Sequence, residues 1–377
     1  MRRDILRLAA ASLILLCGGI AGAAPAPAWT ELSDLRCLAL RSGFSTHQFS
    51  SFDRKGGNED WGHFLKEEGN RRVLADVSGP GEIVRIWSAN PSGTLRVFAD
   101  GASQPVLAGP FAGLFDGKIP PVAAPLATRS SGGCISYWPI PFTKSVRIET
   151  VDSDRFYYHV TYRTWNIGAP TAAAPADAVR KAQSLWAQPG PLRAGVTSPD
   201  PLVAQGGVQR RARRDFRLRP GRSGHALKLT GQGYIYEMRF MLPAAEIQAL
   251  RKTRLVIRWD GCRTPGVDAP LLDLFGSAFG LRDFKTLPIG RTNDGWYYLR
   301  LPMPFRRSAE INLVNQSSRT LLVHLNAGWV QGRLSPDALY YRTAFNAETT
   351  AAGRPHRILS ARGEGQYVGV TMSMEAK

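Results

Sequence analysis

The stretches LRVFADGASQPVLAGPFAGLF (residues 95–115) and LVIRWDGCRTPGVDAPLLDLF (residues 255–275) align with each other without a gap. The Asp-Gly pair at Asp100 matches the one at Asp260, and the prolines and the final phenylalanine match at the same offset of 160 residues. Farther along, YWPIPFTKSVRIE (residues 137–149) matches RLPMPFRRSAEIN (residues 300–312) at an offset of 163. Self-similarity in a conserved order indicates two tandem copies of one structural module.

Each copy has the pattern of β-structure. Short runs rich in branched and aromatic residues are separated by Gly and Pro, as expected of strands. An Asp-Gly pair directly after a strand favours a tight turn, and a Pro-x-Pro-Phe motif is confined to a strand edge or entry. The runs are EIVRIWS, TLRVFAD, SVRIET and FYYHVTYRTW in the first copy, and YIYEMRF, RLVIRWD, GWYYLRL and TLLVHLN in the second. We therefore predict an all-β fold of two tandem β-jelly-roll (β-sandwich) modules with few short helices.

Helical patterns are rare and help to place the module boundaries. The best candidates are residues 175–188 and 243–252, with a short helix expected within 32–40. The first of these lies in an Ala- and Pro-rich stretch between the modules, which we interpret as a linker. The predicted organisation is a signal peptide (1–23), an N-terminal segment (24–49), a first jelly-roll module (50–167), a linker with one helix (168–205) and a second module (206–377) that we expect to be incomplete at its C-terminus.

The N-terminus has the three parts of a secretory leader. Arg2 and Arg3 precede an apolar run over residues 8–20, and small residues follow at 21–23. This run is too short for a membrane span and is typical of a signal peptide. Because no second apolar run approaches membrane-spanning length, we expect an exported protein, periplasmic or secreted, without membrane insertion.

The chain is strongly basic. Its formal charge is +18, which falls to +16 when Arg2, Arg3, Arg7 and Asp4 leave with the leader. Such a charge raises nucleic acid, anionic lipid or acidic glycan as partners. The densest run, QRRARRDFRLRPGR (residues 209–222), is more typical of a solvated strand edge or a linker than of a phosphate-binding arm, because no aromatic stacking platform accompanies it. We therefore expect no nucleic-acid partner.

Neither a metal, a cofactor nor a common nucleophile motif is indicated. The cysteines left after leader cleavage, Cys37, Cys134 and Cys262, are odd in number and form no C-x-x-C pair. This argues against a zinc site or a disulfide framework. The sequence also lacks a G-x-S-x-G elbow, a P-loop and H-E-x-x-H. The chemistry that remains is that of carboxylates and aromatic rings, which points to carbohydrate binding and glycosidic bond cleavage.

One stretch without helical or strand periodicity concentrates polar and aromatic groups: SSFDRKGGNEDWGHF, residues 50–64. Carboxylate, amide and guanidinium groups can bind sugar hydroxyls while a tryptophan stacks on the C–H face, and paired glycines permit close approach. The candidate substrate-binding residues are Asp53, Arg54, Asn58, Asp60 and Trp61. The alternative is that the polar side chains only hydrogen-bond one another to hold a long loop.

Several motifs occur in the order found in one known family. SSFDRKGGNEDW, GPGEIVRIW, YWPIPFTKSVRIE and FYYHVTYRTW come first, followed by WDGCRTPGVDAPLLDLFG, LPMPFRRSAEI and GEGQYVGV. In these motifs the chain resembles glycoside hydrolase family 172, from about residue 50 to residue 370. The resemblance implies a β-jelly-roll enzyme, commonly oligomeric through trimers, that acts with retention on fructofuranosyl or D-arabinofuranosyl linkages. It also implies two catalytic glutamates about 5 Å apart.

The chain departs from that family in two places. The family's glutamates lie in GEGDE and GTGTEDYF motifs after a GHYVG strand, and neither motif occurs here after GEGQYVGV. Glu364 and Glu375 do not stand at those positions, so we assign no catalytic residue. In LYYRTAFNAE (residues 339–348), Arg342 stands at the family's usual His and Phe345 at its usual Trp, which predicts a changed substrate preference or a degraded pocket.

Two functions follow from these observations. The first is an exported retaining furanosidase, of which this chain is a fragment without the catalytic glutamates. The second is a non-catalytic glycan-binding or structural double jelly-roll protein. Under the first, the partners are an oligo- or polysaccharide with furanose units and other copies of the chain in a trimer-based homo-oligomer. Nucleic-acid binding would rest on charge alone.

Overall fold

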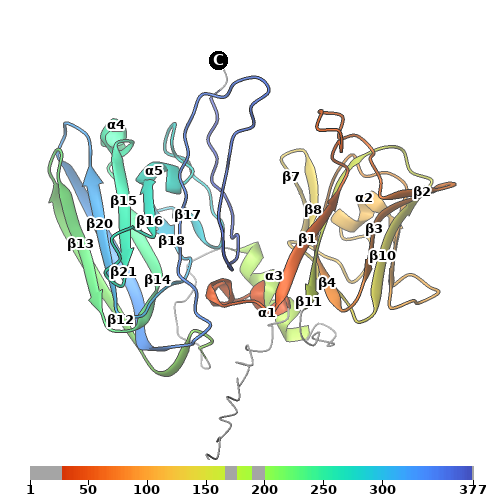
Figure 1. The fold of residues 1–377 in the computed structure, drawn as a ribbon, viewed down its shortest axis with the longest axis horizontal. Coiled ribbons are helices and arrows are strands. Elements are labelled where there is room, and N and C mark those ends of the chain that lie inside the picture. The colour runs from red at the N-terminus through yellow and green to blue at the C-terminus, as the bar shows by residue number, and fades with distance from the viewer. Residues whose placement is uncertain (1–27, 166–175, 189–199, 376–377) are drawn as a thin grey trace, which may run out of the picture.

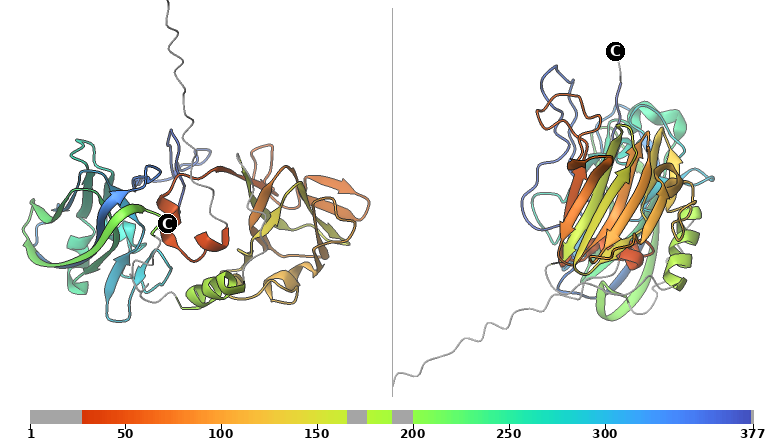
Figure 2. Two further views of the ribbon diagram at one scale, coloured as in Figure 1. Left: turned by 90° about the horizontal axis from the view of Figure 1, so that it is seen from below. Right: turned by 90° about the vertical axis from the view of Figure 1, so that its right-hand side faces the viewer.

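The computed structural model describes residues 28–165, 176–188 and 200–375, and the account below concerns these residues. The predicted signal peptide and most of the predicted linker outside its helix lie beyond them. Two β-sandwiches lie side by side, the first formed by residues 44–165 and the second by residues 203–334 (Figure 1). The left-hand view of Figure 2 shows the same division from below.

The first sandwich consists of two antiparallel sheets. One has the order β1 (Phe44–Ser50), β11 (Tyr157–Trp165), β4 (Gly81–Ala89), β8 (Gly133–Ser136) and β7 (Ala127–Ser130), with β9 (Ile140–Phe142) also pairing with β4. The other has the order β2 (Lys66–Glu68), β3 (Arg71–Ser78), β10 (Ser145–Val151), β5 (Thr94–Ala99) and β6 (Leu107–Pro110). The polar stretch of residues 50–64 therefore lies between β1 and β2, apart from Ser50, which ends β1.

The second sandwich repeats this arrangement. One sheet has the order β12 (Val203–Leu218), β21 (Leu321–Leu334), β14 (Gly233–Met241), β18 (Trp296–Leu299) and β17 (Ile289–Arg291), with β19 (Met303–Phe305) pairing with β14. The other has the order β13 (Ser223–Thr230), β20 (Ser308–Asn315), β15 (Thr253–Trp259) and β16 (Val267–Pro270). Residues 209–218 of the arginine-rich run lie on β12 at the edge of its sheet, so the strand-edge interpretation is confirmed for this part.

The strand order is that of a jelly roll in both copies. In each six-stranded sheet the first strand of the module lies beside the last, as β1 beside β11 and β12 beside β21. This interleaving of early and late strands is the two-Greek-key arrangement of jelly rolls. The predicted all-β fold of two tandem jelly rolls is confirmed. The last strand of the second copy, β21, ends at Leu334.

Alternation of side chains explains the two separate cores. Along β20 the pattern is strictly half-buried and buried in turn, with Ala309, Ile311 and Leu313 fully inside. Since successive strand residues point to opposite faces, one face of each sheet is apolar and must be covered by the other. One core fills the first sandwich and a second, distinct core fills the second.

In each sandwich, the Asp-Gly motif is hydrogen-bonded to the turn that follows the Pro-x-Pro-Phe motif. The Oδ1 atom of Asp100 accepts hydrogen bonds of 2.6–3.2 Å from the backbone N–H groups of residues 143–145. The Oδ1 atom of Asp260 does the same with residues 306–308, at 2.7–3.0 Å. Both aspartates have positive φ, 58° and 56°, which Asp tolerates better than most residues. Each Asp-Gly turn therefore caps the turn that follows the Pro-x-Pro-Phe motif.

Helices are few and short. They are α1 (Ala28–Glu31), η1 (Leu35–Ala39), α2 (Phe111–Phe115), α3 (Ala176–Ala187), η2 (Ala244–Glu246), α4 (Ile247–Leu250) and α5 (Leu271–Leu274). The helix predicted at residues 175–188 is α3, the one at 243–252 divides into η2 and α4, and the one at 32–40 is the 3-10 turn η1. Among the described helices none has the length and apolar character needed to cross a membrane.

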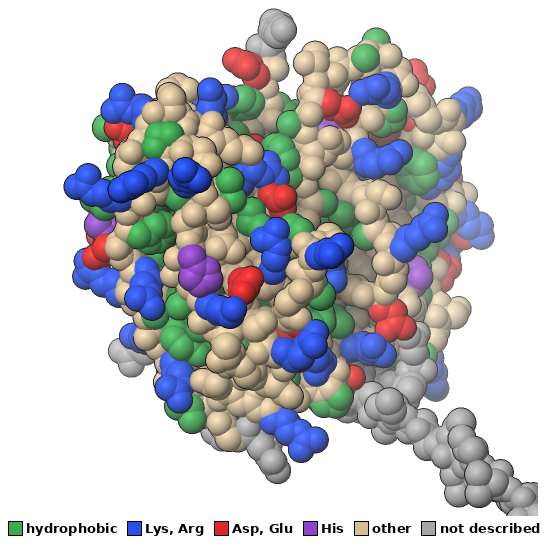
Figure 3. Space-filling model, turned by 60° about the vertical axis from the view of Figure 1, so that its left-hand side comes forward, with side chains coloured by type: hydrophobic (Ala, Val, Ile, Leu, Met, Phe, Trp, Pro, Cys, Tyr) green, Lys and Arg blue, Asp and Glu red, His purple; other side chains and the backbone are tan. Residues whose placement is uncertain are grey.

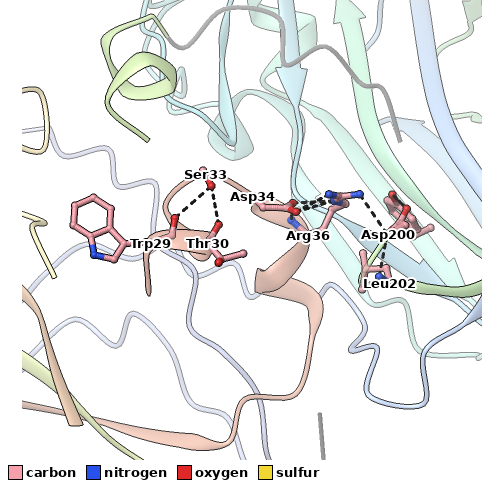
Figure 4. A network of polar contacts seen from close by, with 8 residues as sticks. Trp29, Thr30, Ser33, Asp34, Arg36, Asp200 and Leu202 are labelled. Carbon is pink, nitrogen blue, oxygen red and sulfur yellow. Dashed lines mark hydrogen bonds and ion pairs between the residues drawn. The ribbon is translucent and has the colours of Figure 1, made fainter. Parts of the chain in front are cut away.

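The segment before β1 contacts both sandwiches. Trp29 belongs to the core of the first sandwich, with its ring 4.8 Å from that of Trp138. A few residues later, Arg36 lies between Asp34 and Asp200 (Figure 4), and Asp200 also accepts a 2.6 Å hydrogen bond from the hydroxyl of Tyr234 in the second sandwich. Residues 28–41 therefore join the two halves.

Candidate functional site

The polar loop predicted to bind sugar runs from the end of β1 to the start of β2, and both of its ends are fixed. Ser51 donates its N–H to the carbonyl of Tyr158 and accepts the N–H of Tyr158 on its Oγ, both at 3.1 Å. At the other end, the N–H of Leu65 donates to the carbonyl of Val73 at 2.9 Å. Residues 51–65 thus leave and rejoin the first sandwich at defined points, at its upper end in Figure 1.

Two of the predicted residues turn inward and hold the loop. Asp53 is 9% exposed and its Oδ1 accepts the N–H of Lys55 at 2.9 Å, while its own N–H donates to Asp60 Oδ1 at 2.7 Å. The bond from the Lys55 N–H is the main cause of a lowered pKa at Asp53, against the opposing effect of burial. Gly57 permits this packing, because a Cβ there would lie 2.4 Å from Asp53 Oδ2. The bonds of Asp53 and Asp60 therefore agree with the alternative that these side chains hold the loop in shape.

The other three predicted residues face outward or lie half-buried. Arg54 and Asn58 are exposed, and the Arg54 guanidinium lies 5.0 Å from the ring of Phe52. Phe52 is itself 54% exposed, which sequence reasoning missed, although an aromatic residue inside a polar loop was a signal. Trp61 is half-buried, with its ring edge-on to Tyr157 at 4.9 Å. These groups, together with Phe52, are available to a ligand.

Trp61 contacts Tyr157 of β11. The outward face of β4 and β11 carries further aromatic groups. Trp87 and His159 are register partners on these strands, with ring centroids 4.8 Å apart. Arg85 Nη1 lies 3.3 Å from His159 Nδ1, so the ring nitrogen accepts from the guanidinium. We call Arg85, Trp87, Tyr157 and His159 the β4–β11 face. Alternation within FYYHVTYRTW places Tyr158 and Val160 in the core and Tyr157 and His159 outside, a signal that was present in the sequence.

The electrostatics of this face favour a neutral imidazole. Burial lowers the pKa of His159, the Arg85 guanidinium lowers it further, and the nearby Asp60 carboxylate opposes both. A neutral ring accepts the bond from Arg85 and keeps its other nitrogen as a donor. Aromatic rings, an imidazole donor and a guanidinium beside a polar loop form a surface that can bind sugar hydroxyls and C–H faces.

A pocket of about 370 Å³ lies at one end of the second sandwich, around the Asp260 turn. It is lined by Trp259, Asp260, Cys262, Thr264, Gly266, Arg306, Arg307, Tyr340 and Arg342. The Tyr340 hydroxyl donates to Asp260 Oδ2 at 2.5 Å, and Trp259 Nε1 donates to the carbonyl of Tyr341 at 2.8 Å. Gly266 is required beneath Trp259, since a Cβ there would lie 2.3 Å from the indole nitrogen.

Of the two residues at which the chain departs from the family it resembles, only one lies at this pocket. Arg342 lines the pocket, whereas Phe345 is 41% exposed, with the Arg254 guanidinium 5.7 Å from its ring. The pocket joins residues from β15, from the turn after β19 and from the segment after β21. Spacing in the sequence could not have revealed this grouping.

Within residues 28–165, 176–188 and 200–375, no cluster of three or more His, Cys, Asp or Glu side chains could hold a metal ion. The cysteines of this part are free thiols, buried at Cys37 and Cys134 and exposed at Cys262.

The solved structures that match this chain have low sequence identity and low TM-scores. The major capsid protein P2 from bacteriophage PM2 is 8% identical and covers 78% of this chain and 100% of its own, with a TM-score of 0.21. The Sulfolobus Turreted Icosahedral Virus structure gives 7% identity, 77% and 91% coverage and a TM-score of 0.23. A putative secreted protein from Eubacterium rectale gives 8% identity, 77% and 74% coverage and a TM-score of 0.18. These TM-scores are too low to indicate a shared overall fold.

Comparison with curated proteins finds no match. Family models do match, one for each sandwich. The GH172 first beta-sandwich domain matches residues 42–173, and the GH172 domain-like model matches residues 209–324. Together they cover about two thirds of the sequence and follow the tandem division seen in the structure. The chain therefore belongs to the GH172 family and is a carbohydrate-active protein of two β-jelly rolls.

Proposed function

We propose that the protein is exported and that this chain recognises furanose units of an oligo- or polysaccharide, on the surface formed by the loop 51–64 and the β4–β11 face. The observation that carries the proposal is the grouping of Trp61 and Tyr157 with Arg85, Trp87 and His159 beside that loop. Family membership supports the carbohydrate class, and the leader pattern at residues 1–23 supports export.

Cleavage of furanosides with retention is the activity implied by the resemblance. It requires two carboxyl groups about 5 Å apart. In the loop, Asp53 and Asp60 are both engaged by backbone N–H groups, and the GEGDE and GTGTEDYF motifs do not occur in this sequence. We therefore assign recognition to these residues and name no catalytic residue among them.

We include self-association through trimers in the proposal. The segment after β21 exposes large apolar side chains close together in the chain, which is unusual for a surface that faces only water. They are Ile358, Leu359, Tyr367, Val368, Val370, Met372 and Met374. Sedimentation of the purified protein gives the oligomeric state directly, and a monomer at micromolar concentration would contradict this part of the proposal.

The chain offers a closely matched pair of variants to test the binding surface. Phe52 and Phe279 are 54% and 48% exposed, and each has an arginine guanidinium over its ring, at 5.0 Å and 5.7 Å. Only Phe52 lies on the loop. Calorimetric titration with arabino- and fructofuranosyl oligosaccharides should show a loss of affinity of about fivefold for Phe52→Ala, in line with an aromatic contact of about 1 kcal/mol.

Phe279→Ala serves as the control and should bind like the wild type. Equal affinities of wild type, Phe52→Ala and Trp61→Ala would place furanoside binding elsewhere on the molecule and contradict the assignment of this surface.

A further inference from the structure

The pocket at the Asp260 turn carries an excess of positive charge. Its charged lining residues are one carboxylate, Asp260, and three guanidiniums, from Arg306, Arg307 and Arg342. Its volume lies in the range of small-molecule sites. A pocket of this size with three cationic groups favours an anionic occupant.

The carboxylate of the pocket accepts four hydrogen bonds from the protein itself. Asp260 Oδ1 accepts three backbone N–H groups and Oδ2 accepts the Tyr340 hydroxyl. Burial raises the pKa of Asp260, but these hydrogen bonds outweigh burial and lower it. The carboxylate therefore serves the turn and the Tyr340 hydroxyl, and the four hydrogen bonds that it accepts include none from a guanidinium.

Two of the arginines, Arg306 and Arg307, are held by carbonyl groups and not by acids. Arg306 Nη2 donates to the carbonyls of Pro336 and Ala338, both at 3.0 Å, and Arg307 Nη2 donates to the carbonyl of Asp260 at 2.8 Å. In the described part of the chain, no carboxylate forms an ion pair with Arg306, Arg307 or Arg342. Carbonyl partners fix a guanidinium in position without neutralising it, which leaves it able to bind an oxyanion.

The first sandwich shows that the turn does not need these arginines. Asp100 makes the same three backbone bonds, but Thr143 and Lys144 stand where the second sandwich has Arg306 and Arg307. Since one fold element forms with either set of side chains, its stability does not explain the paired arginines. Arg342 comes from a different segment altogether, after β21.

We propose that this pocket binds an acidic sugar, with the carboxylate or phosphate oxygens on Arg307 and Arg342 and the sugar hydroxyls against Thr264 and Tyr340. Guanidinium groups suit both oxyanions because their donors are planar and paired. The sugar part of the proposal rests on the proposed function, and the anion part rests on the pocket alone. Figure 3 shows Lys and Arg side chains spread widely over the face turned to the viewer, so general charge must be separated from this site by experiment.

Cys262 provides a built-in probe, because it lines the pocket and is exposed while Cys37 and Cys134 are buried. We would measure the rate of iodoacetamide alkylation on the peptide containing Cys262 in the full chain, with millimolar glucuronate, glucose 6-phosphate, glucose or inorganic phosphate. Glucuronate or glucose 6-phosphate should slow the reaction at least fivefold, whereas glucose and inorganic phosphate should have little effect. Which of the two acidic sugars protects better identifies the oxyanion.

Arg342→Gln should weaken this protection about tenfold, as expected for the loss of one charge-assisted hydrogen bond of about 1.5 kcal/mol. The matched control is Arg263→Gln, which removes an arginine from the same turn but not from the pocket lining. Equal loss in both variants would mean that general charge is responsible and would overturn the proposal.

Other outcomes would overturn it as well. Equal protection by inorganic phosphate would show an anion site that does not recognise the sugar. Equal protection by glucose would show that the charge of the ligand does not contribute to binding. Absence of protection by every compound would show that none of them binds in this pocket. Trp61→Ala should leave the protection unchanged, so the two proposals fail separately.

Discussion

At the scale of single residues, Asp260 shows how one side chain serves both fold and pocket. Its carboxylate caps the turn after β19 and positions the ring of Tyr340, whose pKa rises to about 12 through burial and the bond to Asp260. The equivalent Asp100 caps the first sandwich in the same way. The repeated motifs in the sequence therefore form the same hydrogen-bonded turn in both sandwiches.

We predict that Asp260→Ala lowers the free energy of unfolding by about 2 kcal/mol, because three backbone N–H groups lose their acceptor. The control is Asp268→Ala, which removes a surface ion pair with Arg254 and should cost about 0.5 kcal/mol. Urea unfolding followed by tryptophan fluorescence measures both. Equal losses would contradict the capping role.

The pH dependence of stability follows from the same carboxylates. The pKa values of Asp53, Asp100 and Asp260 are lowered from the ordinary value of 3.8. A lowered folded-state pKa contributes stability that is present above the unfolded-state value and is lost as the pH falls through the folded-state value. We expect the unfolding free energy to fall steeply below about pH 4, and less steeply in Asp260→Ala. If Asp260→Ala leaves the slope of unfolding free energy against pH unchanged, the carboxylate of Asp260 does not contribute to the pH dependence.

At the scale of elements, the loop 51–65 depends on its internal bonds for its shape. Asp53 fills the space that a side chain at position 57 would occupy. The strands on either side are set by pairing with β11 and β3, so the loop can change without loss of the sandwich. Loop shape and global stability should therefore respond separately to substitution.

Gly57→Ala should abolish most furanoside binding while it lowers the unfolding free energy by less than about 1 kcal/mol. The added methyl group displaces Asp53 and with it the turn that presents Arg54 and Asn58. Gly365→Ala is a suitable control, because a Cβ at that position meets no neighbour within 4 Å and the backbone has no positive φ. Unchanged binding in Gly57→Ala would show that the loop shape does not matter for the ligand.

At the scale of the whole molecule, residues 28–41 connect two sandwiches that have separate cores. Arg36 bonds to Asp34 and lies 3.6 Å from Asp200, whose side chain is 6% exposed. A backbone bridge pairs Leu40 with Ala338, beside the second sandwich. The N-terminal segment thus spans from Trp29 in the first core to strand ends of the second.

Arg36→Met should detach this segment from the second sandwich, since it leaves the buried Asp200 carboxylate without its cation, at a cost of about 3 kcal/mol. Hydrogen exchange should show faster exchange in residues 34–41, while the core strands β14 and β20 stay protected. Arg41→Met, which removes an exposed contact with Glu364, is the control. Unchanged protection in Arg36→Met would contradict the connecting role.

Much of the fold could be predicted because its signals are local. The alternation along β20 and the spacing of the two repeated motifs needed no knowledge of distant contacts. The loop was different, since the inward turn of Asp53 depends on bonds that composition does not specify. The β4–β11 face required the register that places Trp87 beside His159, and the pocket required three segments that are remote in the chain. Sites of this kind depend on tertiary placement.

Furanoside recognition is tested most directly by a fluorescence titration of the purified protein with arabinofuranosyl and fructofuranosyl oligosaccharides, beside pyranosyl oligosaccharides of the same length. We predict saturable binding of a furanoside, weaker binding of the pyranosides, and about a tenfold loss of furanoside affinity in Trp61→Ala. Absence of binding, or equal binding of both sugar classes in wild type and variant, would contradict this prediction.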